Sequence, residues 1–167
     1  MRRRSSRVKI AFHDRGPLDA NRLLSAGSWS VYWYNGFIVS SEIARGLDIF
    51  ELVPSAFLTQ NEIDAAKTVR FEYLNTQGQQ KHVWPASFAL PRAYLDQLER
   101  SKAIPASDIT AARTELSRAE SLSGQPRRDA LTQLATRMHG VAARATTDAP
   151  KAHTMASAIG DLANAQR

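Results

Sequence analysis

Residues 29–52, with the sequence WSVYWYNGFIVSSEIARGLDIFEL, decide the fold of the first third of this chain. Two runs rich in aromatic and β-branched residues flank Asn35-Gly36, and a third run follows Arg45-Gly46. Such runs are typical of strands, and Asn-Gly favours a type I′ turn because both central residues need a positive φ. The stretch therefore predicts an up-and-down meander. Its strands are expected over about 29–34, 37–42 and 47–52.

A further strand is predicted near residues 7–13. Val8, Ile10 and Phe12 alternate there with more polar or smaller neighbours, which is the pattern of a half-buried strand. Short connections make neighbouring strands antiparallel. We therefore expect one four-stranded antiparallel sheet over residues 7–53, with a face that needs cover.

The aromatic residues of the meander fall on both faces of the expected sheet. Strict alternation places Trp29 and Trp33 on one face with Val31, and Tyr32 and Tyr34 on the other. Aromatic side chains on both faces indicate a sheet that is covered on both sides. Packing explains this pattern without a ligand, and stacking surfaces for sugars or bases are the alternative.

Residues 54–90 are interpreted as a mixed connector. The segment from Thr59 to Glu62 fits a capping box, in which the threonine hydroxyl and the glutamate carboxylate each satisfy an amide of the other residue. A short helix is therefore predicted over about 60–68. Residues 69–75 alternate again, and they fit either an extended segment or a continuation of that helix.

Residues 91–167 are interpreted as a helical bundle. Pro105, Pro126 and Pro150 each stand at or near an expected helix start, where the missing amide does no harm, and Gly124 stands where a helix should stop. The apolar stripes are too narrow to hold a lone helix in water, so the helices should pack together as an antiparallel bundle. The helices are predicted over about 91–102, 106–122, 127–147 and 150–165.

The charge of the chain is concentrated at its start. The net charge is +6, and residues 1–15 hold six basic residues and one acidic residue, whereas the remaining chain holds sixteen and fifteen. We interpret residues 1–6, which include three consecutive arginines, as a basic disordered arm. Because the body of the chain is nearly neutral, this distribution argues against nucleic acid as a partner. A contact between the arginines of this arm and phosphates is the weaker alternative.

The sequence leaves the compartment open. No apolar run approaches the roughly 18 residues of a transmembrane helix, and the apolar stretch of an export signal does not follow the arginines. We therefore expect neither a membrane span nor an export signal. Cysteine is absent, which excludes disulfides and thiolate metal sites.

Three segments together carry a resemblance to a known family. They are residues 10–17 (IAFHDRGP), the meander itself with SEIARGLDIFEL at 41–52, and residues 54–66 (PSAFLTQNEIDAA). Over about residues 8–68 the chain resembles the last repeat of LVIVD-repeat proteins, which are bacterial and archaeal β-propeller proteins often predicted to be exported or at the cell surface. The resemblance implies that residues 7–53 form a single propeller-like blade. The helices from Tyr94 to Leu134 are similar to FIMAH-type helical modules in their leucine and alanine spacing.

The chain departs from the family in the number of its repeats. A propeller needs about four to eight blades, and this sequence supplies one blade with no internal repeat. We therefore expect the chain to be a fragment of a larger protein. The resemblance carries no catalytic motif that transfers to these residues.

Two pairs of polar residues on the expected strands are poorly placed to act together in catalysis. His13 and Asp14 are adjacent on an expected strand and so point to opposite faces. Asp48 and Glu51 are three apart on another strand, which also separates them and does not support a paired-carboxylate mechanism. Phosphate-binding and nucleophile motifs are absent from the sequence.

The remaining candidates are given structural roles. His82, His139 and His153 lie far apart in sequence, with no i, i+4 spacing to hold a metal. Glu42 and Arg45 flank a strand end, and we expect an ion pair between them that fixes the turn. No catalytic, cofactor-binding or metal-ligating residue is assigned.

The sequence therefore predicts an α+β protein that is a non-enzymatic scaffold or interaction module, the last blade and helical extension of an LVIVD-type propeller. Its partners would be proteins, either upstream blades or a second copy of the chain. The alternative is a carbohydrate- or peptide-binding module that uses exposed aromatic side chains. The candidate binding residues are Trp29, Tyr32, Trp33 and Tyr34.

Overall fold

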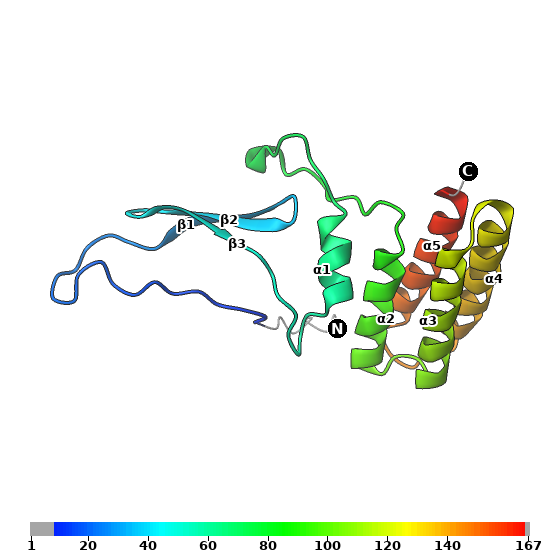
Figure 1. The fold of residues 1–167 in the computed structure, drawn as a ribbon. Coiled ribbons are helices and arrows are strands. Elements are labelled where there is room, and N and C mark those ends of the chain that lie inside the picture. The colour runs from blue at the N-terminus through cyan, green and yellow to red at the C-terminus, as the bar shows by residue number, and fades with distance from the viewer. Residues whose placement is uncertain (1–8, 166–167) are drawn as a thin grey trace.

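The computed structural model describes residues 9–165, and it shows a small sheet at one end of the molecule and a helical bundle at the other (Figure 1). Helix α1 (Gln60–Lys67) stands between these two parts. The predicted α+β class is confirmed. The predicted basic arm at residues 1–6 lies outside the described residues.

The sheet contains three antiparallel strands in sequence order. They are β1 (Ser28–Tyr34), β2 (Phe37–Glu42) and β3 (Gly46–Phe50), so that β2 is central and β1 and β3 are edges. Tyr34 pairs with Phe37 across the first turn. Asn35 and Gly36 have φ values of 50° and 99°, which confirms the positive φ at both central residues that a type I′ turn requires. The last strand ends at Phe50, two residues earlier than predicted.

The prediction of a fourth strand at residues 7–13 is wrong for the part that the structure describes. Residues 9–13 are irregular, and they contact the sheet through side chains rather than through a backbone ladder. The His13 ring lies 4.7 Å from the Phe50 ring, and Arg15 Nη1 donates a hydrogen bond of 2.8 Å to Asp48 Oδ1. These contacts hold the segment across a face of the sheet, where it cannot pair with an edge strand.

The predicted capping box of α1 is confirmed. Glu62 N donates to Thr59 Oγ1 over 3.2 Å, and Thr59 N donates to Glu62 Oε2 over 2.8 Å. After α1, residues 69–75 are neither helix nor strand. They lead into a short 3-10 turn, Thr76–Gly78, on the loop that projects away from the bundle (Figure 1).

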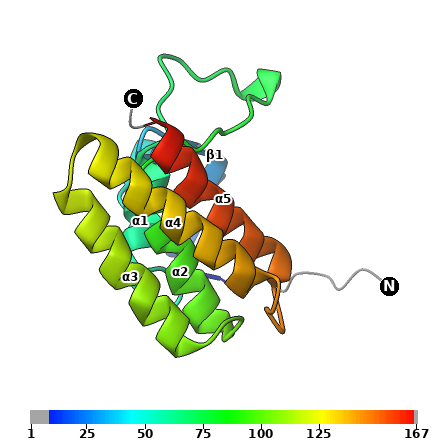
Figure 2. The same cartoon turned by 90° about the vertical axis from the view of Figure 1, so that its right-hand side faces the viewer.

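The helical bundle is built from α2 (Ala89–Ser101), α3 (Ala106–Ser121), α4 (Gly124–Ala142) and α5 (Ala149–Ala165). The loops join them at alternating ends, so consecutive helices run antiparallel (Figures 1 and 2). Helix α2 packs against α3 and α5, and α4 packs against the same two helices. Each helix of the bundle therefore has two neighbours, and α1 adds to the outside of α2.

Two predicted helix ends differ from the structure. The sequence predicts a helix end at Gly124, but this residue is the first of α4, with a φ of 57°. Helix α4 ends at Ala142 instead of near 147, and the chain turns at Asp148, where φ is 50°. Among the described helices, none is long and apolar enough to cross a membrane.

The main cluster of buried apolar residues lies in the bundle and in the turn between α2 and α3. Ile63, Ala65 and Val69, on and just after α1, are buried as well. The largest fully buried side chains of the cluster include Leu95, Leu98, Ile109, Leu116, Leu131, Met138, Met155, Ile159 and Leu162. Within residues 9–165, no residue of the sheet belongs to this cluster. A three-stranded sheet needs a packed hydrophobic face to be stable by itself. The bundle therefore has a buried core of its own, whereas the sheet lacks one among the described residues.

Candidate functional site

The strand register sorts the side chains of the sheet onto two faces. Ser28 and Ser40 share one face with hydroxyl oxygens 2.5 Å apart, and Ser30 and Ser41 share the other with oxygens 2.8 Å apart. We call the first the inner face, because residues 11–16 run across it, and the second the outer face. The inner face carries Val31, Trp33, Ile38, Ser40, Glu42, Asp48 and Phe50. The outer face carries Tyr32, Tyr34, Phe37, Val39, Leu47 and Ile49.

The inner face forms the floor of a cavity of about 570 Å³ beneath residues 11–16. Val31, Ile38 and Phe50 make the floor apolar. Charged groups on the rim are already engaged within the chain, as the Arg15–Asp48 pair shows. The cavity is therefore an apolar pocket with a largely self-paired polar border.

Glu42 organises one end of this cavity. One carboxylate oxygen accepts from Gly27 N over 2.6 Å, and the other accepts from the amides of Ala44 and Arg45. These backbone donors, with Gly27 first, lower the pKa of Glu42 against a smaller opposing effect of burial. The expected Glu42–Arg45 side-chain ion pair is not what fixes the turn, because the Arg45 guanidinium donates to the carbonyls of Gly16 and Pro17.

Three carboxylates that line the cavity are engaged within the chain. Asp14 accepts a hydrogen bond of 2.7 Å from Gly16 N, so its carboxylate stabilises a local turn instead of orienting His13. Glu51 pairs with Lys67, and Asp48 pairs with Arg15. In the part of the chain that the structure describes, no group of three or more His, Cys, Asp or Glu side chains is placed to hold a metal.

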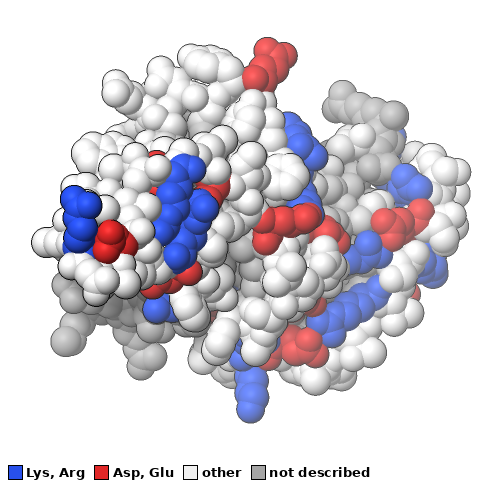
Figure 3. All heavy atoms as spheres, turned by 60° about the vertical axis from the view of Figure 1, so that its left-hand side comes forward, with Lys and Arg blue, Asp and Glu red and all other residues white. Residues whose placement is uncertain are grey.

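The outer face is an apolar surface with no helix packed over it. Ile49 and Leu47 are 62% and 60% exposed, and Phe37 and Tyr32 are also exposed. No charged side chain lies on this face. Elsewhere on the side of the molecule shown in Figure 3, Lys and Arg are interspersed with Asp and Glu. The outer face is therefore distinguished by its apolar character and its exposure.

The four predicted binding residues occupy different environments. Trp29 is 80% exposed and sits at a β-bulge, where the register of β1 shifts between Ser28 and Ser30. Tyr32 is exposed on the outer face, whereas Trp33 is half-buried on the inner face. Tyr34 donates its hydroxyl proton toward the carbonyl of Glu72, 3.1 Å away, which ties it to the connector. The structure thus leaves Trp29 and Tyr32 most accessible to a partner.

Asn35 holds the connector against the hairpin. Its Nδ2 donates to Phe71 O over 2.9 Å, and its Oδ1 accepts from Phe71 N over 2.8 Å. The side-chain amide of Asn35 therefore bonds both the N–H and the carbonyl of Phe71, as the backbone of a paired strand residue does. The contact places Leu74 and His82 beside β1, where they help to line a second cavity of about 220 Å³.

A polar cluster that sequence reasoning missed joins α1 to α2 and α3. Asp96, which is 7% exposed, accepts from Thr59 Oγ1 over 2.7 Å and from Asn61 Nδ2 over 2.8 Å. Its other oxygen accepts from Arg113 Nη2 over 2.7 Å. Every carboxylate oxygen is thus used within the chain, which makes the cluster a structural joint between helices.

Two of the histidines lie close together in space. The rings of His139 on α4 and His153 on α5 lie with centroids 6.0 Å apart, whereas the His82 ring contacts Phe71 on the connector. Distance along the sequence therefore does not predict that His139 and His153 lie close together in space. Their separation of fourteen positions in the sequence carries no helical periodicity that would have signalled it.

Comparison with known proteins identifies no relative of this chain. No family model, no curated protein and no solved structure matches it.

Proposed function

We propose that this chain is a non-enzymatic scaffold or interaction module whose protein partner packs on the outer face of the sheet. The observation that carries the proposal is the exposure of Leu47 and Ile49 on a face with no charged side chain. Contiguous exposed apolar surface of this kind marks interaction sites in soluble proteins. The bundle supplies a separate core, so it can hold the sheet while a partner covers it.

The resemblance to LVIVD-repeat proteins supports a partner that is itself a sheet. In a propeller each blade is packed between neighbouring blades, so both of its faces carry apolar side chains. The inner face here is partly covered by residues 11–16, and the outer face is open. The partner that fits is a neighbouring blade or, for the isolated chain, the same face of a second copy.

Self-association of the isolated chain tests this proposal. Ile49→Lys is expected to raise the dissociation constant of self-association roughly tenfold or more, because the burial of an isoleucine contributes about 1.5–3 kcal/mol. Sedimentation equilibrium over a range of protein concentrations measures the effect. The matched control is Leu23→Lys, which changes a fully exposed apolar residue outside the sheet.

The proposal fails if the wild-type protein is monomeric throughout that range. It also fails if the two lysine variants lose association equally, because the effect would then reflect charge and not the outer face.

A carbohydrate- or peptide-binding module is the second candidate, and the exposure of Trp29 favours it. An exposed indole ring offers a stacking surface worth about 1–3 kcal/mol per ring in the base-stacking proteins where this is measured. Trp29→Ala is expected to abolish saturable binding in a glycan or peptide screen. Trp84→Ala, on the connector, is the control and should leave binding unchanged. Equal binding by wild type and Trp29→Ala would exclude this function.

A further inference from the structure

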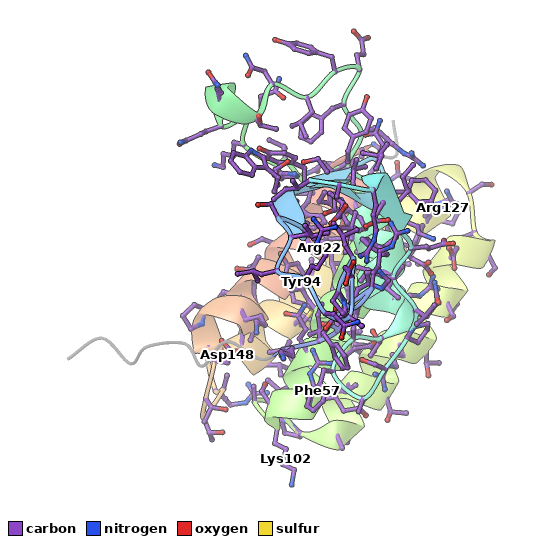
Figure 4. All side chains as sticks on the ribbon, turned by 90° about the vertical axis from the view of Figure 1, so that its left-hand side faces the viewer. Arg22, Phe57, Tyr94, Lys102, Arg127 and Asp148 are labelled. Carbon is purple, nitrogen blue, oxygen red and sulfur yellow. The ribbon has the colours of Figure 1, made fainter. Side chains whose placement is uncertain are left out.

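His139 and His153 form a pair across the most extensive helix contact of the bundle. They lie on α4 and α5, close to the loop that joins these helices, where Figure 4 labels Asp148. Both side chains are exposed, and their ring planes are inclined by 33°. The pair is separate from the sheet and from the residues of the proposed interaction surface.

The ring separation suits a single bridging metal ion. An ion about 2.1 Å from one nitrogen of each ring lies about 3.2 Å from each centroid, so centroids up to about 6.4 Å apart can share it. The observed separation is 6.0 Å. A tetrahedral angle at the metal brings the centroids to about 5.2 Å, which is a closure of under about 1 Å for two exposed side chains.

The neighbouring helix positions place no large charged side chain on the same faces as the two histidines. Positions three and four residues away on a helix share a face with the histidine, and here they are all small or uncharged. These positions hold Ala135, Thr136, Ala142, Ala143, Ala149, Pro150, Ala156 and Ser157. At the adjoining loop, Lys151 Nζ lies 2.9 Å from Asp148 Oδ2, so the lysine charge is locally balanced.

We propose that His139 and His153 bind a divalent transition-metal ion that links α4 to α5. Imidazole nitrogen suits Cu²⁺, Ni²⁺ and Zn²⁺, and Cu²⁺ should bind most tightly. Water completes the coordination, because no third metal-ligating side chain joins the pair among the described residues. An ion held by both helices binds the folded chain better than the unfolded one, so it raises the midpoint of thermal unfolding.

Titration of the tag-free protein with Ni²⁺ alone, followed by calorimetry, tests the site. We expect one ion per chain, and His139→Ala or His153→Ala should each weaken binding roughly 100-fold, because the second ligand no longer acts at a high effective concentration. His82→Ala removes a histidine from the connector and serves as the control. It should bind Ni²⁺ as the wild type does.

Electron paramagnetic resonance of the Cu²⁺-loaded wild-type protein gives a second readout that needs no variant. Coupling to two imidazole nitrogens is expected. Coupling to one nitrogen, two independent ions per chain, or an equal loss of affinity in the His82→Ala control would each overturn the proposal. Circular dichroism of the two alanine variants confirms that lost binding does not reflect lost helix.

Discussion

Leu131→Ala is expected to lower the free energy of unfolding by about 3–5 kcal/mol. The leucine side chain is fully buried in α4, within the cluster that joins the bundle helices. Its truncation removes apolar contacts and leaves a cavity, and Leu→Ala changes at such positions cost about 2.7–5 kcal/mol. Urea denaturation followed by circular dichroism at 222 nm measures the change.

Leu47→Ala is the matched control, because it makes the same chemical change on the outer face of the sheet. Leu47 is exposed there, and surface substitutions away from special features stay within about 0.5 kcal/mol. An equal loss in both variants would contradict a core confined to the bundle. The expected difference would instead show that helix packing, and not the outer face of the sheet, stabilises the chain.

The features predicted correctly from the sequence depend on residues that are close along the chain. Asn35-Gly36 specifies its own turn because few residues tolerate a positive φ, and the structure shows that φ at both positions. The capping box of Thr59 and Glu62 spans one helical turn, and both of its hydrogen bonds form. The bundle helices follow from periodic apolar positions and from prolines near helix starts.

The incorrect predictions concern features that are set by contacts between segments distant in the sequence, which the local residue pattern does not specify. Residues 9–13 alternate as a strand does, but a strand also needs an edge to pair with, and side-chain contacts with Asp48 and Phe50 hold this segment across a face. Glycine adopts a positive φ at little steric cost wherever it stands, and Gly124 does so at the first residue of α4. The glycine alone therefore does not say whether a helix ends or begins there. Helix α4 ends at Ala142, and the turn at Asp148, where φ is 50°, brings α5 back beside α4.

The candidate site was only partly visible in the sequence for similar reasons. Alternation assigned faces to the aromatic residues, but the bulge at Trp29 interrupts the alternation, and Tyr34 is engaged by the connector. The joint around Asp96 connects this residue to Thr59, which is 37 positions away in the sequence. The His139–His153 pair arises from the packing of α4 on α5. Neither leaves a spacing that a sequence pattern can reveal.

Asp96→Ala is expected to lower the free energy of unfolding by about 2–3 kcal/mol, the largest expected effect after that of Leu131→Ala. Thr59 Oγ1 donates its proton to Asp96 while accepting the amide of Glu62, so Asp96 orients the hydroxyl that caps α1. Its removal also leaves Asn61 Nδ2 without this acceptor and leaves Arg113 with only its hydrogen bonds to Glu99. Partly buried groups left unsatisfied cost about 1–3 kcal/mol, and more where a charge is involved.

Glu99→Ala provides the matched control for Asp96→Ala. Glu99 accepts from the same Arg113 guanidinium at 2.7 Å, but its side chain is half exposed. Exposed ion pairs contribute about 0–1 kcal/mol, so this variant should unfold almost as the wild type does. Hydrogen exchange of the α1 amides should accelerate in Asp96→Ala only. Equal destabilisation by the two changes would show that the Arg113 charge, and not the joint to α1, is what matters.

The pH dependence of stability distinguishes the contribution of the Asp96 charge from the contribution of the size and geometry of its side chain. Burial raises the pKa of Asp96, but hydrogen bonds from Thr59, Asn61 and Arg113, together with the Arg113 charge, outweigh it and lower the pKa below its ordinary value. A carboxylate with a lowered folded-state pKa stabilises the fold fully above the unfolded value of about 3.9, and this stabilisation is lost as the pH falls through the folded-state pKa.

Asp96→Asn keeps the size of the side chain and removes its charge. Its deficit relative to the wild type should therefore be full at neutral pH and shrink as the pH is lowered below about 4. Urea midpoints of the two proteins across that range measure the deficit. A deficit of constant size would mean that the geometry of the joint, independent of ionisation, holds α1 on α2. A shrinking deficit would show that the ionised carboxylate orders the cap of α1 and so fixes the helix that stands between the sheet and the bundle.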